Sequence, residues 1–117
     1  MNRYKELLVW QKAIDLAVEV YQVTEKLPKE EKYGLISQIN RSVVSIPSNI
    51  AEGAGRNSNK EFNNFLGIAQ GSAFELDTQL IISNRLKFIS NQEYQNIEVQ
   101  LVHIQNMVAR LKKSLNL

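Results

Sequence analysis

Residues Arg41 to Arg56 read RSVVSIPSNIAEGAGR, and the pattern of this stretch indicates the fold. Branched apolar residues recur through it, and through the five residues before it, at alternating spacings of three and four, which predicts one face of an α-helix. They are Ile36, Ile39, Val43, Ile46 and Ile50. A second stripe keeps that spacing but consists of Gln38, Ser42, Ser45, Asn49 and Glu52, called here the polar stripe. Ser and Asn are poor helix formers, so this stripe indicates close contact with another helix, another subunit or a ligand.

The composition is that of one globular domain, expected to span residues 1–117. Apolar residues make up 44% of the chain and charged residues 22%, and the formal net charge is only +2. There is no cysteine, which excludes disulfides and thiolate metal sites. No apolar run reaches the roughly 18 residues that a membrane span needs, and the start of the chain does not read as a secretory signal. We therefore expect a cytoplasmic protein without a membrane partner.

Four helices are expected, and no segment alternates like a strand. The first should run over about 7–26 and the second over about 29–52, ended by left-handed glycine in Gly53-Ala54-Gly55. Capping-box patterns begin the third at Ser58 and the fourth at Ser90, with a turn at 87–89 between them.

Each helix carries an apolar face. The first shows Trp10, Ala13, Ile14, Ala17, Val20 and Tyr21, with Val9, Leu16 and Val23 beside them. The third shows Phe62, Leu66, Ala69, Ala73, Leu76 and Leu80, flanked by Phe65, Phe74 and Ile81. The fourth shows Tyr94, Ile97, Leu101, Ile104, Val108, Leu111 and Leu115. Four such helices with short turns predict an all-α, antiparallel up-down-up-down four-helix bundle. The extra apolar residues on the first and third helices indicate an interface between subunits.

Small residues mark a second candidate contact. Gly67 and Gly71 are four residues apart on one face, although glycine inside a helix costs about 1 kcal/mol relative to alanine. Close approach of another backbone would explain them. The predicted oligomer or helix-contact stripe is therefore Gln38, Arg41, Ser42, Ser45, Asn49, Glu52, Gly67 and Gly71.

The bundle would also gather charge at one end. This basic end consists of Arg3, Lys5, Arg56, Lys60, Arg110, Lys112 and Lys113. Against these seven cations stand Glu6, Glu52 and Glu61, so the local charge is +4, more than the +2 of the whole chain. It is the candidate nucleic-acid patch, although lysines at helix ends also serve solubility and complement the helix dipole.

The chain resembles a known family in LLVWQKAIDLAVEVY, YGLISQINRSVVSIPSNIAEGAGR and KEFNNFLGIAQGSAFELDTQLIIS. It looks like the four-helix-bundle proteins encoded in intervening sequences of bacterial 23S ribosomal RNA genes. The same fold resembles the accessory protein of diversity-generating retroelements. The resemblance implies a non-enzymatic bundle that assembles as a ring-shaped homopentamer. In the retroelement relatives it also implies a basic surface for nucleic acid and a reverse transcriptase.

Catalysis and metal binding have little support in the sequence. His103 is the only histidine, and the candidate nucleophiles Ser45 and Ser48 have no histidine near them in the sequence. Bundle metal sites use Glu-x-x-His pairs, and none occurs. Gly53-Ala54-Gly55-Arg56 follows a helix and not a strand, unlike a P-loop. We expect no catalytic, cofactor-binding or metal-ligating residues and no cofactor.

Two functions remain open from the sequence. One is a homo-oligomeric interaction protein that uses its basic end on RNA or on a nucleic-acid-processing protein. The alternative is a small ligand-binding protein or an uncharacterised enzyme with an open pocket lined by Gln38, Arg41, Ser45 and Asn49.

Overall fold

The computed structural model describes residues 3–116; residues 1, 2 and 117 of the expected domain lie outside the described residues. Its four α-helices are α1 (Leu8–Thr24), α2 (Leu35–Ala54), α3 (Asn59–Arg85) and α4 (Asn91–Ser114). Two short 3-10 helices, η1 (Tyr4–Glu6) and η2 (Lys29–Glu31), precede α1 and α2. The all-α four-helix class is confirmed.

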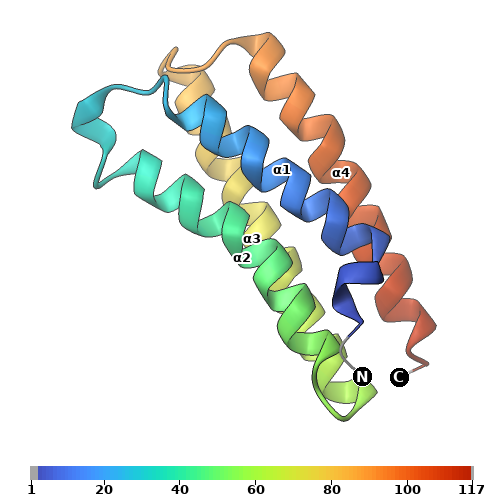
Figure 1. Ribbon diagram of the computed structural model, residues 1–117. Helices are drawn as coiled ribbons and strands as arrows, with labels where there is room; N and C mark the ends of the chain where they lie inside the picture. The colour runs from blue at the N-terminus through green and yellow to red at the C-terminus, as the bar shows by residue number, and fades with distance from the viewer. Residues whose placement is uncertain (1–2, 117) are drawn as a thin grey trace.

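The helices form a square around one core. α1 and α3 each pack against both α2 and α4. Figure 1 shows consecutive helices running in alternating directions, which is consistent with the expected up-down-up-down order. The start of α1, the end of α2, the start of α3 and the end of α4 consequently lie at the same end of the molecule (Figure 1).

Three of the expected apolar faces line this core as predicted. On α2, the residues Ile39, Val43, Ile46 and Ile50 are buried. On α3 they are Leu66, Ala69, Ala73, Leu76 and Leu80, and on α4 they are Ile97, Leu101, Ile104 and Val108. Burying one such Leu or Ile side chain contributes about 1.5–3 kcal/mol, so these ladders supply most of the stability.

The register of α1 differs from the prediction. Its buried apolar residues are Val9, Ala13, Leu16, Val20 and Val23. Trp10 and Ala17 are only partly buried, and Tyr21 is 45% exposed. Both stripes on this helix are apolar, so periodicity alone does not select the face that enters the core. The supposed surplus of Val9, Leu16 and Val23 is therefore core, and it does not mark a subunit interface.

The second helix starts later than expected. Lys29–Glu31 forms the 3-10 turn η2, and α2 begins at Leu35, after Gly34. The carboxylate of Glu31 folds back, and its Oε1 accepts a hydrogen bond from the Leu35 backbone N at 3.2 Å. This bond satisfies an amide in the first turn of α2, which otherwise has no partner.

The predicted left-handed glycine at the end of α2 is wrong. Gly55 has a φ of −82° and a ψ of −4°, which any residue can adopt. Among the described residues, positive φ angles occur at Lys87 and Asn116 and not at glycine. Glycine is needed at position 53 for a different reason, because α3 approaches α2 closely there.

The end of α3 uses a lysine where glycine is usual. Lys87 has a φ of 65°. Its backbone N donates to Asn84 O at 2.9 Å, and the Phe88 N donates to Ser83 O at 2.9 Å, which is the Schellman pattern. The predicted turn at 87–89 is confirmed by this motif.

Lys87→Gly is expected to raise the free energy of unfolding by about 1 kcal/mol, because glycine adopts the left-handed conformation without the steric cost of a Cβ. Urea denaturation of both proteins measures the change. Lys87→Ala, which removes the same charge but keeps a Cβ, is the control and should give no such gain. An equal gain in both variants would attribute the effect to charge.

Serine caps the starts of α3 and α4 as predicted, but only the start of α4 forms the complete capping box expected at both. Ser58 Oγ accepts from the Glu61 N at 3.1 Å, and Ser90 and Glu93 form a complete capping box. The Glu93 carboxylate also forms an ion pair with Lys26, in which the Lys26 Nζ lies 2.8 Å from the Glu93 Oε2. This ion pair joins the end of α1 to the start of α4. The Lys26 hydrogen bond, followed by the Ser90 amide, lowers the pKa of Glu93 below its ordinary 4.5. The ionised Glu93 carboxylate therefore stabilises the folded protein fully above pH 4.5. This stabilisation is lost as the pH falls through the lowered pKa.

Candidate functional site

The polar stripe of α2 is divided between a helix contact and the surface. Ser42 is buried, and Ser45 and Asn49 are partly buried. The Ser45 hydroxyl lies 2.7 Å from that of Ser72 on α3. Gln38, Arg41 and Glu52 are exposed.

The polar groups at the centre of this stripe form hydrogen bonds within the protein. The Asn49 amide nitrogen donates to the backbone O of Ser45 at 2.8 Å and to its Oγ at 2.9 Å. Together with Ser72, these groups satisfy one another in the seam between α2 and α3. This arrangement argues against an open pocket lined by Gln38, Arg41, Ser45 and Asn49. Serine is used here because its small side chain lets the two helices approach while its hydroxyl stays hydrogen-bonded.

The glycines differ sharply in their surroundings. A Cβ at Gly53 would lie 2.7 Å from the Phe65 Cβ and 2.8 Å from the Phe62 Cδ1, so α2 and α3 meet there. A Cβ at Gly67 would meet only the Lys112 Nζ, at 3.4 Å. At Gly71 no described atom from elsewhere in the chain would lie within 4 Å. The close approach expected at Gly67 and Gly71 is thus absent among residues 3–116, and contact there with a second copy stays a prediction.

The bundle gathers the predicted basic end at the ends of its helices. Arg3 and Arg56 line one hollow of about 250 Å³, together with Ser58, Asn59 and Phe62. Arg56 pairs with Glu52 at 2.9 Å, and its guanidinium carbon lies 4.8 Å from the centre of the Phe65 ring. These contacts fix the position of the Arg56 guanidinium group at the connection between α2 and α3.

Most cations of this end have no acidic partner among residues 3–116. Arg3 lies 3.8 Å from Glu6, and Arg56 is paired as described. Within the described residues, no ion pair forms at Lys5, Lys60, Arg110, Lys112 or Lys113. The Lys112 Nζ instead donates to the backbone O of Asn63 at 3.4 Å. Most of the positive charge at the basic end is therefore not neutralised by an acidic side chain among residues 3–116.

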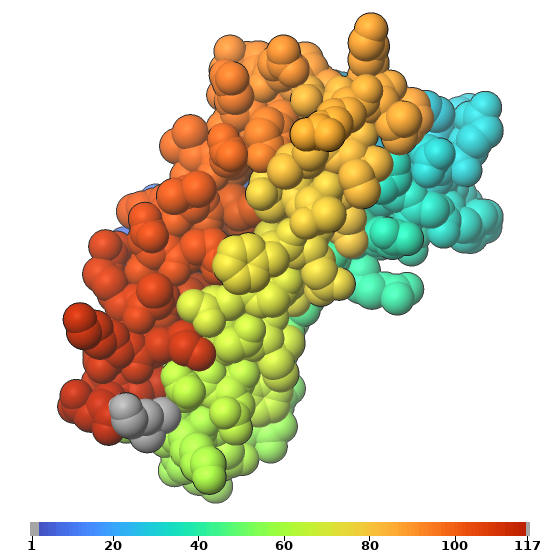
Figure 2. Space-filling view, turned by 180° about the vertical axis from the view of Figure 1, so that it is seen from behind, coloured from blue at the N-terminus to red at the C-terminus, as the bar shows by residue number. Residues whose placement is uncertain are grey.

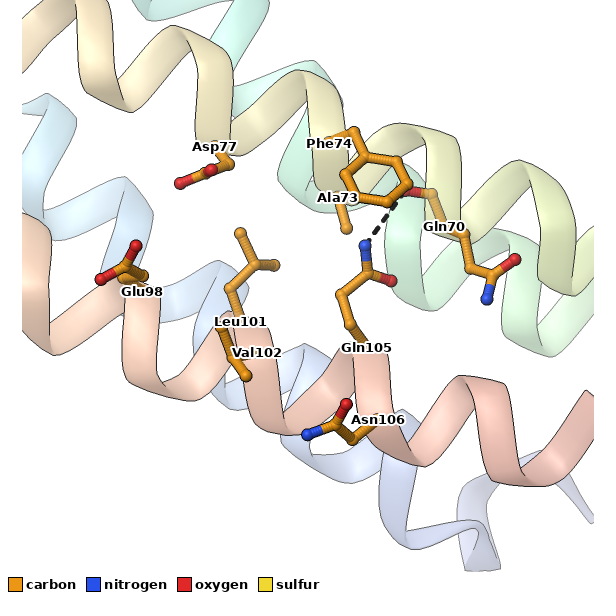
Figure 3. A pocket seen from close by; sticks show the side chains of 9 residues that line it. All are labelled: Gln70, Ala73, Phe74, Asp77, Glu98, Leu101, Val102, Gln105 and Asn106. Carbon is orange, nitrogen blue, oxygen red and sulfur yellow. Dashed lines mark hydrogen bonds between the residues drawn. The ribbon is translucent and has the colours of Figure 1, made fainter.

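A groove between α3 and α4 was not predicted from the sequence. This α3–α4 groove has a volume of about 260 Å³ and is lined by the nine residues labelled in Figure 3. Figure 2 shows the two helices lying side by side across this face. Phe74 is 69% exposed at its edge and Val102 is 52% exposed, whereas Ala73 and Leu101 are buried. A usable signal was present, since the segments 62–84 and 91–109 contain no lysine or arginine.

One end of the groove is acidic. Asp77 of α3 and Glu98 of α4 face each other there (Figure 3). The Tyr94 hydroxyl lies 2.8 Å from the Asp77 Oδ1 and 3.1 Å from the Glu98 Oε2. Burial, and then the neighbouring Asp77, raise the pKa of Tyr94, so its phenol remains protonated at neutral pH.

The remaining candidates for chemistry stay apart. His103 is exposed and lines a separate hollow beside Lys12 and Asp15, which Ser45 and Ser48 do not line. Among residues 3–116, no group of three or more His, Asp or Glu side chains is placed to hold a metal ion. None of the helices in this part of the chain is long and apolar enough to span a membrane.

Comparison with known proteins identifies the family. The profile described as "23S rRNA-intervening sequence protein" matches residues 5–110. The chain belongs to this family. No match was found among curated proteins.

A solved structure supports the assignment. The chain is similar to a protein of unknown function from the S23 ribosomal protein family of Bacteroides thetaiotaomicron VPI-5482, a crystal structure at 1.70 Å resolution. The two are 29% identical, with a TM-score of 0.84, and the match covers 91% of this chain and 99% of that one. The two chains thus share this bundle along nearly their whole length.

Proposed function

We propose that this protein is a non-enzymatic, homo-oligomeric interaction protein of the cytoplasm that binds RNA through its basic end. The observation that carries the proposal is the separation of charge along the bundle. The basic end holds +4. The middle of the bundle holds two cations, Lys12 and Arg41, against five acids, which leaves −3. A polyanion is therefore attracted to one end and repelled from the sides.

The chemistry of the basic end fits phosphate. Arg3 and Arg56 line one hollow, each beside an acidic side chain that a phosphate would have to displace, and guanidinium matches phosphate oxygens in charge and geometry. Ser58 and Asn59 add neutral hydrogen-bonding groups at the start of α3. Such contacts position a nucleic-acid backbone without reading its sequence. A bundle of this kind would bind RNA with little sequence preference.

Exposed apolar side chains support assembly. Five of them, Ile68, Phe74, Ile82, Val99 and Val102, lie on α3 and α4. Phe74 and Val102 line the same groove between α3 and α4, and adjacent exposed apolar side chains of this kind are typical of an interaction surface. The family resemblance gives five as the number of copies, and a ring would place five basic ends close together and strengthen the field. Light scattering at low and high salt tests this number directly.

The test of RNA binding is fluorescence anisotropy with a single-stranded RNA probe between about 50 and 200 mM salt. The variant Lys60→Gln/Lys112→Gln/Lys113→Gln is expected to bind about tenfold more weakly or worse, with the slope of log K against log salt reduced by about 2. The matched control removes three cations at the opposite end, Lys29→Gln/Arg85→Gln/Lys87→Gln, and should change affinity by less than about twofold.

Two results would count against the proposal. Equal weakening by both triple variants would mean that binding follows total charge and not the basic end. Absence of binding by the unmodified protein at the lowest salt would exclude RNA and leave a nucleic-acid-processing protein as the partner to test.

A further inference from the structure

The α3–α4 groove needs an occupant that is apolar and cationic. Its edge exposes Phe74 and Val102 to solvent, which is costly unless another surface covers them. Its acidic end carries the carboxylates of Asp77 and Glu98 (Figure 3). Because the segments 62–84 and 91–109 contain no lysine or arginine, neither wall supplies a cation.

The two carboxylates share one donor within the described residues. The Tyr94 hydroxyl lies within hydrogen-bond distance of both Asp77 and Glu98, at 2.8 and 3.1 Å. A phenol has a single proton, so it can donate fully to only one of them. Within the described residues neither acid forms an ion pair. An ammonium group from another molecule would supply a donor to the carboxylate that does not receive the Tyr94 proton.

The chain carries a matching group elsewhere on its surface. Tyr33, between η2 and α2, is 88% exposed and is the most exposed of the large apolar side chains. The Lys32 ammonium lies 5.4 Å from the centre of the Tyr33 ring, so the aromatic ring and the cation project together. Glu31 is turned back onto the Leu35 amide, whereas Glu30 remains exposed on the same turn. The pair Lys32 and Tyr33 is called the knob below.

We propose that, in the homo-oligomer, the knob of one copy inserts into the α3–α4 groove of the next. The Tyr33 ring packs against Phe74 and Val102, and the Lys32 ammonium reaches Asp77 and Glu98. The inference rests on the proposed homo-oligomer and specifies its interface. Because knob and groove are different parts of the surface, the contact is head-to-tail, and head-to-tail contacts close into rings when the rotation allows.

The first test is the oligomer mass across a concentration series. Tyr33→Ala is expected to raise the dissociation constant by about tenfold or more, because exposed aromatic anchors dominate such interfaces. Leu8→Ala, which removes a 55% exposed apolar side chain at the other end of α1, is the control and should leave assembly within about twofold. Lys32→Glu should weaken assembly, and Lys32→Glu/Asp77→Lys should restore part of it. Circular dichroism checks that each variant is folded.

The second test exploits the head-to-tail geometry. Tyr33→Ala lacks the knob but keeps the groove, and Val102→Glu blocks the groove but keeps the knob. Each alone should be largely monomeric, and an equal mixture should form a complex of two chains and no larger, because only one productive interface remains. Glu30→Gln should strengthen assembly, since it removes an acid that the acidic groove repels.

The outcomes separate the two ideas. An unmodified protein that stays monomeric at all concentrations would overturn both the homo-oligomer and the knob-in-groove contact. An oligomer whose mass is unaffected by Tyr33→Ala, or a mixture that does not assemble, would overturn the contact alone.

Discussion

Gly53→Ala is expected to lower the free energy of unfolding by about 2 kcal/mol, even though alanine is the better helix former. The added Cβ would lie 2.7 Å from the Phe65 Cβ and 3.3 Å from the Phe62 backbone O. Both atoms are fixed close to the main chain of α3, so the two helices must separate to admit the methyl group. Urea denaturation measures the loss.

The same substitution at Gly71 is the control. Gly71 is exposed, and nothing else in the described chain would approach its Cβ within 4 Å. Gly71→Ala should therefore gain about 0.5–1 kcal/mol from helix propensity alone. Gains of similar size at both positions would show that α2 and α3 are not in close contact at Gly53. A loss at Gly71 would reveal a second copy pressed against that face.

Leu16→Ala is expected to cost about 3 kcal/mol. Leu16 is 0% exposed in the centre of α1, and truncation leaves a cavity that the four-helix core cannot close fully. The result matters because the sequence placed the centre of the apolar face near Trp10, Ala17 and Tyr21, with Leu16 to one side. Thermal or urea unfolding of the variant distinguishes the two registers.

Tyr21→Ala is the matched comparison on the same helix. Its side chain is 45% exposed, so its removal should cost less than about 1 kcal/mol despite its larger size. If Tyr21→Ala proved the more damaging substitution, the register of α1 described here would be wrong.

Much of the candidate site could be anticipated as a list of residues but not as a geometry. The basic end follows from helix order, since antiparallel neighbours bring the ends of four segments together. Helix order does not predict that Arg3 and Arg56 line one hollow, because this depends on the conformation of the chain before α1 and after α2. The polar stripe was recognised as a contact surface, but its partner Ser72 was not identified. Matching Ser45 to Ser72 requires the relative height and rotation of two helices.

Four helices, three of their four core faces, and the caps at Ser58 and Ser90 follow from the sequence alone. These features are local: a period of 3.6 residues and a capping side chain act within a few positions of the chain. The buried face of α1, the role of Gly53 and the α3–α4 groove are set by how the helices pack. Each depends on which surface meets which neighbour. Where two faces of one helix are both apolar, as on α1, packing volume and not periodicity selects the buried one.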